Sequence, residues 1–201
     1  MYIDGFNLYK GCISGTRFKW LDLRRFSEGL LRHHPIDQIN YFTARVVDRP
    51  EDPRQSQRQD IYWDALTTVE GVVIHRGHFR TRTKKVWLLE DGGRKASAKV
   101  TEEKATDVKL ASRLVWDACH ASMTCALVVS NDADFQESID LAMEKRVEVI
   151  LVNPHHHRKQ RDHLKGTDVR RIRPALLRCS QLPERVRLAD GRFVHRPPEW
   201  S

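Results

Sequence analysis

The spacing of apolar residues along this chain predicts short strands interleaved with helices. Apolar positions three and four residues apart predict helices, and apolar runs or alternations bounded by polar turns predict strands. The predicted helices cover residues 21–32, 54–69, 102–120 and 135–145. The predicted strands cover residues 1–4, 36–47, 71–79, 124–130, 147–152 and 168–172. Strands that alternate with helices in this way favour an α/β fold, with a mostly parallel sheet covered on both faces.

Two hairpins are predicted in addition to the interleaved pattern. Their strands are expected over residues 81–90, 186–188 and 193–195. Asp91-Gly92-Gly93 follows the first of these segments, and Asp190-Gly191 joins the other two, as tight turns require. We therefore expect residues 1–173 to form one domain and residues 174–201 to form a small C-terminal arm packed on it.

Composition favours a globular protein of the cytoplasm. The 201 residues are 40% hydrophobic and 31% charged, which is enough apolar material for one domain with a buried core. No apolar run approaches the roughly 18 residues of a membrane helix, and no basic segment followed by an apolar one resembles a secretory signal. We therefore expect a cytoplasmic location and no membrane contact. The four cysteines form no CxxC pair, which favours structural roles for them.

Positive charge is concentrated near the C-terminus. The chain has 35 Lys and Arg against 27 Asp and Glu, a formal net charge of +8. Residues 155–201 contain 12 of the basic residues and 5 acidic ones, a difference of +7. A basic surface of this kind is typical of proteins that bind nucleic acid, although some basic tails only keep a protein in solution. We expect RNA to bind this surface, and a homodimer stays open as a further partner.

The first acidic segment is Ile3-Asp4-Gly5-Phe6-Asn7. Asp4 follows the first predicted strand and precedes a glycine, which places it at the strand's carboxyl end. In open α/β sheets this edge binds ligands. Taken alone, Asp4 could equally form an Asx turn and Asn7 a helix N-cap.

The second acidic segment is Ser130-Asn131-Asp132-Ala133-Asp134-Phe135. It directly follows a buried strand and opens a helix, so its carboxylates also lie at a carboxyl strand end. One carboxylate can cap the helix, which is worth about 1 kcal/mol. Two carboxylates in one turn exceed what capping requires, and a bound cation would relieve their repulsion.

The third acidic segment lies at the predicted start of the helix over residues 102–120. Its inward-facing residues are expected to be Ala111, Leu114 and Ala118. Helical spacing places Asp107 near the middle of this stripe and Glu103 one turn earlier. Two like charges four residues apart destabilise a helix, and the helix dipole offsets only part of this. A metal ion or a nearby cation is therefore the better account of acids that face the core.

These acids can meet at one edge of the sheet and form a metal site. Carboxylate oxygens suit Mg²⁺ or Mn²⁺, which bridge substrate phosphates and activate a bound water. Together with the basic surface, the acids predict hydrolysis of phosphodiester bonds. The chain contains neither a GxSxG motif nor a P-loop, which argues against a serine hydrolase and against an ATP-driven enzyme.

The chain resembles the NYN domain family of PIN-like metal-dependent nucleases in three motifs, taken in chain order and at roughly this spacing: Ile3-Asp4-Gly5-Phe6-Asn7, Glu103-Lys104-Ala105-Thr106-Asp107 and Ser130-Asn131-Asp132-Ala133-Asp134-Phe135. The resemblance covers about residues 1–173. It implies a PIN-like three-layer α/β/α sandwich with a central, mainly parallel sheet. It also implies an endoribonuclease that uses Mg²⁺ or Mn²⁺.

The resemblance also assigns roles to residues. It implies that the metal ligands are Asp4, Asp107, Asp132 and Asp134, and that Asn7 orients water or substrate beside them. Glu103, Ser130 and Asn131 are expected to surround these ligands. The chain departs from the family where Ala105-Thr106 replace the usual Gly-Val, and where Asn131 and Ala133 replace the common Gly and Ser.

Three lysines near the acidic segments are candidates to hold the scissile phosphate: Lys10, Lys104 and Lys109. They could equally be solvated. Two other functions stay open on the sequence. One is an RNA-binding or regulatory module with a degenerate metal pocket, and the other is a metal-dependent enzyme that acts on a small molecule.

Overall fold

The protein is described by a computed structural model that covers residues 1–31, 34–88, 93–120, 123–155 and 163–201. Seven strands form its main sheet, in the order β4-β3-β2-β1-β5-β6-β7. They are β1 (Tyr2–Asp4), β2 (Ile39–Ala44), β3 (Val72–Trp87), β4 (Lys95–Lys104), β5 (Cys125–Val129), β6 (Glu148–Asn153) and β7 (Asp168–Arg171). All neighbouring strands in this sheet are parallel except β3 and β4.

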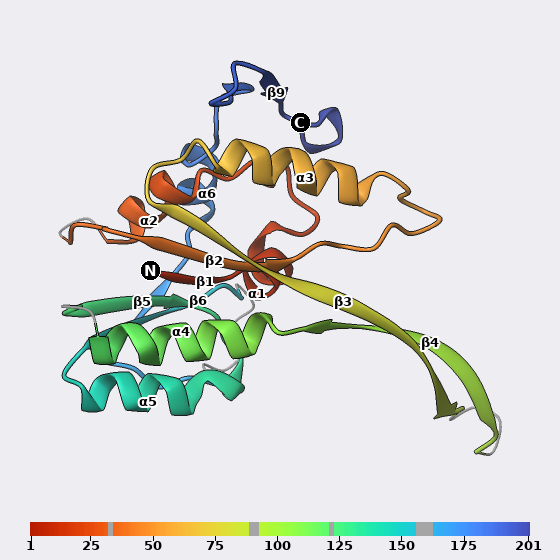
Figure 1. The fold of residues 1–201 in the computed structure, drawn as a ribbon, viewed down its shortest axis with the longest axis horizontal. Coiled ribbons are helices and arrows are strands. Elements are labelled where there is room, and N and C mark those ends of the chain that lie inside the picture. Colours follow the sequence, from red (N-terminus) through yellow and green to blue (C-terminus); the bar gives the residue numbers. More distant parts are fainter. Residues whose placement is uncertain (32–33, 89–92, 121–122, 156–162) are drawn as a thin grey trace.

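Helices cover both faces of this sheet (Figure 1). The helical elements before β5 are α1 (Gly5–Leu8), the π-helix η1 (Tyr9–Ile13), α2 (Leu23–Leu30), α3 (Gln55–Leu66) and α4 (Thr106–His120). The later ones are η2 (Ala133–Phe135), α5 (Gln136–Glu144), α6 (Pro174–Cys179) and η3 (Pro198–Trp200). Helices α4 and α5 lie on one face, and α2, α3 and α6 on the other. The three-layer α/β/α sandwich predicted from the sequence is confirmed.

The core explains why the central strands are apolar throughout. Alternate residues of a strand point to opposite faces, and here both faces are covered. Ile3 packs in the cluster that contains Phe26 of α2 and Trp63 of α3. Its neighbour Tyr2 packs in the second cluster, with Leu110 of α4. Every residue of β1 and β2 is consequently buried.

The helix predicted over residues 102–120 begins later than expected. Helix α4 starts at Thr106, and the preceding residues Lys95–Lys104 form β4, which pairs antiparallel with β3. The expectation that Glu103 lies on the helix one turn before Asp107 is therefore wrong, because its backbone pairs with Phe79 of β3. Backbone pairing with β3 outweighed the helical propensity of the Glu-Glu-Lys segment.

The predicted hairpin arm is longer than its sequence pattern suggested. The strands predicted over residues 71–79 and 81–90 are one continuous strand, β3. The turn expected at Asp91-Gly92-Gly93 falls partly outside the described residues, since the description resumes at Gly93. Figure 1 shows β3 and β4 leaving the body of the protein together as a twisted ribbon.

The C-terminal segment follows α6 and lies against α3. Its predicted hairpin is present as β8 (Arg185–Arg187) and β9 (Phe193–His195). At the end of the chain, the Trp200 ring lies 6.2 Å from the ring of Trp20 and 6.1 Å from that of Tyr62. Glu199 accepts a hydrogen bond of 3.1 Å from Arg54, the residue that directly precedes α3. Within the described residues, no helix combines the length and the apolar character that a bilayer crossing needs.

Candidate acidic site at the carboxyl edge of the sheet

Asp4 lies at the carboxyl end of the central strand β1 and is almost fully buried, at 8% exposure. Its Oδ1 accepts a hydrogen bond of 2.9 Å from the backbone N–H of Asn7, which caps helix α1. Its Oδ2 accepts a hydrogen bond of 3.0 Å from the hydroxyl of Ser130, at the end of the neighbouring strand β5. The capping role and the placement at the edge, considered as alternatives on the sequence, are therefore both present.

The loop after β5 is tied to the loop after β1. The Asn7 side chain accepts a hydrogen bond of 3.2 Å from the backbone N–H of Asn131. The Asn131 side-chain oxygen in turn accepts one of 2.9 Å from the backbone N–H of His163. Ser130 and Asn131 are buried, at 1% and 6% exposure. Asn7 and Asn131 thus hold three loops of the carboxyl edge together.

Asp132 and Asp134 lie at the rim of this framework. Asp132 caps η2, accepting a hydrogen bond of 3.1 Å from the backbone N–H of Asp134, and its own N–H donates to the Ser130 hydroxyl at 3.2 Å. Asp132 is partly exposed and the side chain of Asp134 is exposed. Ser130 thus contacts both Asp4 and Asp132, and the expected role of Ser130 and Asn131 around metal ligands stays a prediction.

Asp107 does not face the core as its helical position predicted. It is the second residue of α4 and is exposed, whereas the buried residues of this helix are Thr106, Leu110, Leu114 and Asp117. The buried stripe runs through these four residues and not through the predicted Ala111 and Ala118, so Asp107 lies to one side of it. Partial desolvation, and then the negative charges of Asp132 and Asp134, raise the pKa of Asp107. The third acidic segment therefore lies in the electrostatic field of the second.

The junction before α4 is tight. Ala105 has a φ of 75°, in the left-handed region that glycine favours. A Cβ added to Gly77 of β3 would lie 2.7 Å from the Lys104 carbonyl oxygen and 2.7 Å from Cγ2 of Thr106. The chain turns from strand to helix within one residue in close contact with β3, so glycine would fit position 105 with less strain than alanine.

The three candidate lysines lie in different settings. Lys109 donates a hydrogen bond of 2.6 Å to the backbone carbonyl of Arg76 and so joins α4 to β3. Lys10 is exposed, 5.7 Å from the centroid of the Phe6 ring. Lys104 is exposed at the end of β4. Their role as phosphate contacts stays a prediction.

The carboxylate oxygens at this edge are ligands of the kind and charge that a divalent cation prefers. Four carboxylates from three loops lie at one edge of the sheet: Asp4, Asp107, Asp132 and Asp134. After partial desolvation, the charges of Asp132 and Asp134 also raise the pKa of Asp107, so these three carboxylates repel one another. Among the described residues, no three or more His, Cys, Asp or Glu side chains are grouped so that they could hold a metal ion. The four carboxylates therefore suit a cation in kind, but as they stand they do not form a complete metal site.

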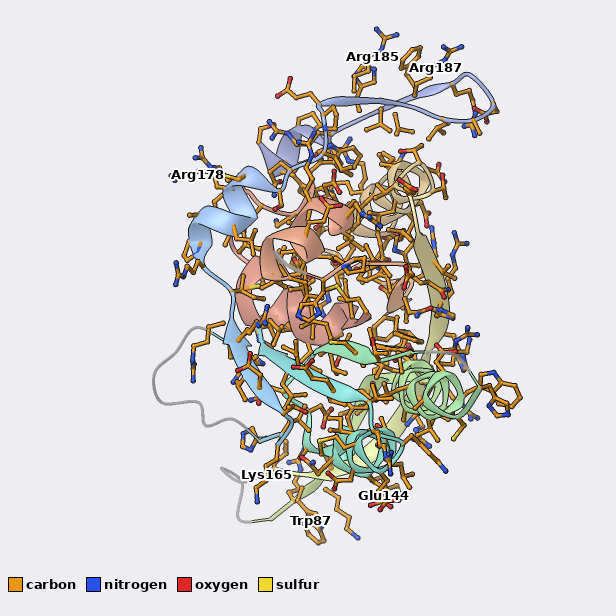
Figure 2. All side chains as sticks on the ribbon, turned by 90° about the vertical axis from the view of Figure 1, so that its left-hand side faces the viewer. Trp87, Glu144, Lys165, Arg178, Arg185 and Arg187 are labelled. Carbon is orange, nitrogen blue, oxygen red and sulfur yellow. The ribbon has the colours of Figure 1, made fainter. Side chains whose placement is uncertain are left out.

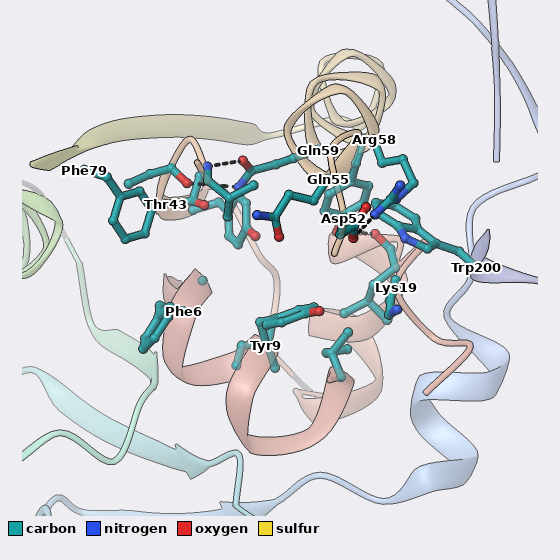
Figure 3. Close-up of a pocket in the computed structure, with 18 residues that line it drawn as sticks. Phe6, Tyr9, Lys19, Thr43, Asp52, Gln55, Arg58, Gln59, Phe79 and Trp200 are labelled. Atoms are coloured by element: carbon teal, nitrogen blue, oxygen red, sulfur yellow. Dashed lines mark hydrogen bonds and ion pairs between the residues drawn. The ribbon is translucent and has the colours of Figure 1, made fainter. Parts of the chain in front are cut away.

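A separate pocket opens on the other side of α1, and sequence reasoning missed it. Its volume is about 180 Å³, and its wall includes Gly5, the residue after Asp4 (Figure 3). Most of its wall is aromatic or aliphatic, and the aromatic residues are Phe6, Tyr9, Tyr41, Tyr62, Phe79 and Trp200. These side chains come from six separate elements, so no single spacing in the sequence connects all of them.

Two cations and an acid line the pocket on the side of α3. Arg58 forms ion pairs with Asp52 and with Glu199, and the first pair holds the pKa of Asp52 below its ordinary value. In the described part of the chain, the buried Nε–H of Arg58 has no hydrogen-bond acceptor. Lys19 lies nearby in the same wall. The pocket could therefore take a flat ring that carries an acidic group.

The basic residues of 155–201 are spread over the molecule. In Figure 2, Arg185 and Arg187 lie at one end and Lys165 near the other, with Arg178 between them. Arg158, Lys159 and Arg161 fall outside the described residues. The expectation that RNA binds a surface formed by this segment stays a prediction.

Fold and site together define a nuclease-type α/β domain of the PIN-like class, with acids gathered at the carboxyl edge of a parallel sheet. The family model described as "NYN domain" matches residues 1–168, and the chain belongs to this family. A curated relative, 6-hydroxy-3-succinoylpyridine 3-monooxygenase HspA of Pseudomonas putida (strain DSM 28022 / S16), is 28% identical over 170 residues. The alignment covers 70% of this chain but 54% of that relative, so the chain spans about half of its length. No solved structure matches the chain.

Proposed function

We propose that this protein is a metal-dependent endoribonuclease that hydrolyses RNA phosphodiester bonds. The observation that carries the proposal is the joining of three acidic segments at one sheet edge, by the 3.0 Å hydrogen bond from Ser130 to Asp4 and by the effect of Asp132 and Asp134 on Asp107. Membership of the NYN family supports it.

Asp4, Asp107, Asp132 and Asp134 would hold Mg²⁺ or Mn²⁺. When bound, such an ion polarises a phosphoryl oxygen and lowers the pKa of a coordinated water. The contribution of the chain itself is positioning. Ser130 orients the buried Asp4 carboxylate, and its hydroxyl also fixes the backbone of Asp132. We expect Asn7, which bridges the same two loops, to keep the acids in register when substrate binds.

The test is cleavage of a labelled RNA pool in Mn²⁺, Mg²⁺ or EDTA, by the wild type and by Asp132→Asn. We expect cleavage only with metal and only by the wild type. Asp140→Asn is the matched control, because Asp140 is an exposed acid on α5 outside the site, and asparagine can still accept its hydrogen bond from Gln136. Cleavage retained by Asp132→Asn would refute the assigned site. RNA that is bound but not cut by the wild type would favour the alternative of a non-cleaving RNA-binding module.

A second candidate function is supported by the aromatic pocket. The relative's name describes a monooxygenase acting on 6-hydroxy-3-succinoylpyridine, a flat ring with an acidic side chain. The pocket offers aromatic walls with Arg58 and Lys19 in them, and its volume of about 180 Å³ suits one small ring. This candidate is an enzyme acting on a small aromatic acid, beside the acidic edge.

Calorimetric titration with 6-hydroxy-3-succinoylpyridine tests the second candidate. Saturable binding that is lost in Lys19→Gln, a change at the pocket wall, would favour it. Lys10→Gln is the control, because Lys10 is exposed beside Phe6 and does not line the pocket. Binding that is absent in the wild type, or unchanged in Lys19→Gln, would dismiss it.

A further inference from the structure

Strand β3 has an inner part that pairs with the main sheet and an outer part that pairs with β4 alone. Strand β2 pairs with β3 only from Val72 to Gly77, whereas β4 pairs with β3 from His78 to Trp87. The outer part of the ribbon is therefore a two-stranded arm, and Figure 1 shows it projecting beyond the sheet. At about 3.3 Å per residue, its ten pairs extend roughly 33 Å. A two-stranded ribbon buries little apolar surface, so the stability of the fold does not account for the length of this arm.

The arm is strongly basic. Residues 78–87 and 95–104, which form the arm, together carry seven Lys or Arg residues against two Glu residues, a net charge of +5. The basic residues are Arg80, Arg82, Lys84, Lys85, Lys95, Lys99 and Lys104. Both acids, Glu102 and Glu103, lie at the base of the arm, next to α4. Apart from these two acids, every charged residue of the arm is therefore Lys or Arg.

One face of the arm combines lysines, hydroxyl groups and an aromatic ring. Cross-strand pairing places Thr83 opposite Lys99, Lys85 opposite Ser97, and Trp87 opposite Lys95, and residues two apart share a face. We call these six residues the lysine face. All six are exposed, Trp87 to 64%, and Lys95 Nζ lies 4.6 Å from the centroid of the Trp87 ring.

Each component of the lysine face suits one part of a single-stranded nucleic acid. Lysine ammonium groups and Ser or Thr hydroxyls bind phosphates. An exposed indole beside a cation provides a platform on which an unpaired base stacks. A duplex fits less well, because the major groove of A-form RNA is too deep and narrow for a ribbon and paired bases are not available to Trp87.

The base of the arm leads directly to the acidic edge. Strand β4 ends at Lys104 and α4 begins at Thr106, so Asp107 lies three residues beyond the arm. We propose that the lysine face of this arm binds single-stranded RNA and leads it along the ribbon to the acidic site. The choice of RNA among polyanions rests on the proposed function, whereas the binding surface itself does not require cleavage.

Binding is measured by fluorescence anisotropy with a labelled, unstructured RNA of about 20 nucleotides, long enough to span the arm. EDTA keeps the RNA intact, and the titration is repeated at increasing salt. The variant is Lys85→Gln/Lys95→Gln/Lys99→Gln. The matched control is Arg17→Gln/Lys145→Gln/Arg146→Gln, which removes three exposed cations that lie outside the arm, the acidic edge and residues 155–201. Circular dichroism verifies that all of the proteins are folded.

Each phosphate contact contributes about 0.7 to the slope of log affinity against log salt for a single strand. Losing three contacts should reduce the slope by about 2, so the wild type should lose roughly 20-fold more affinity than the variant over a fourfold rise in salt. The control should retain the wild-type slope. Trp87→Ala should weaken binding roughly 5- to 150-fold, with little change in slope.

The results separate this inference from the proposed function. A lysine-face variant with wild-type affinity and slope would overturn the inference, even if the wild type cleaves RNA. A loss in the variant but not in the control supports it, even if the wild type never cleaves. An equal loss in the control, or equally strong arm-dependent binding of a duplex of the same length, would overturn it as stated.

Discussion

Replacing Ala105 with glycine should make this protein more stable. Ala105 has a φ of 75°, where an L-residue with a Cβ is strained. Its carbonyl accepts a hydrogen bond of 3.0 Å from the Lys109 N–H, so its conformation is fixed by the start of α4. The close contact between Gly77 and the Lys104–Thr106 junction prevents the backbone from relaxing.

The expected gain is the difference between two opposing terms. The left-handed conformation costs an L-residue roughly 1–2 kcal/mol, and glycine avoids this cost. Glycine also makes the unfolded chain more flexible, which costs about 0.4–1 kcal/mol. The net stabilisation should therefore be about 0.5–1 kcal/mol. For a chain of 201 residues, this raises Tm by about 1–4 °C.

The control makes the same chemical change where the backbone is helical. Ala111 lies inside α4, where glycine in place of alanine should lower the free energy of unfolding by about 1 kcal/mol. Urea unfolding of the wild type, Ala105→Gly and Ala111→Gly measures both effects. The two variants should move in opposite directions. If Ala105→Gly is destabilised as much as Ala111→Gly, the left-handed conformation at residue 105 is wrong.

Three further predictions concern the acidic edge and the core. Ser130→Ala should lower the free energy of unfolding by about 2–3 kcal/mol in urea, because it leaves Asp4 without the hydroxyl donor at 3.0 Å; an unchanged midpoint would contradict this. Asp107→Asn should raise Tm in metal-free buffer. The raised pKa means that charged Asp107 destabilises the fold at neutral pH, so the difference from the wild type should vanish as pH falls below the ordinary value of 3.8. A constant difference would refute the assigned cause. Burial raises the pKa of the Cys12 thiol to about 12, so iodoacetamide should label the exposed Cys119 and Cys179 long before Cys12, as peptide mass spectrometry would detect.

Much of the fold follows from short-range pattern. After their first residues, β5 and β6 are buried throughout, because helices cover both faces of the sheet. A continuous apolar run in the sequence is enough to predict strands of this kind. Asp4, Asp132 and Asp134 were predictable for a related reason. Asp4 is the last residue of a buried strand, and Asp132 and Asp134 lie in the turn after another. Parallel strands bring their carboxyl ends to one edge.

The errors arose where pairing between distant segments decided the outcome. Glu102-Glu103-Lys104 has good helical propensity, yet it forms the return strand of the arm because β3 supplies its hydrogen bonds. The exposure of Asp107 depends on how α4 is rotated against the sheet: its buried residues are Thr106, Leu110, Leu114 and Asp117, whereas the predicted stripe contained Ala111 and Ala118. The aromatic pocket likewise required α3 and the C-terminal Trp200 to meet, although they are far apart in the chain.

Local sequence by itself therefore determined the α/β class, the order of most elements and the acids at the ends of β1 and β5. Tertiary structure alone decided that Ser130 and Asn7 join those acids, that β3 and β4 form a basic arm, and that the chain's end closes an aromatic pocket. The physical reason is the distance along the sequence over which each kind of interaction acts. Periodicity and capping act over a few residues, whereas β pairing, ring packing and charge coupling depend on segments that only the folded chain brings together.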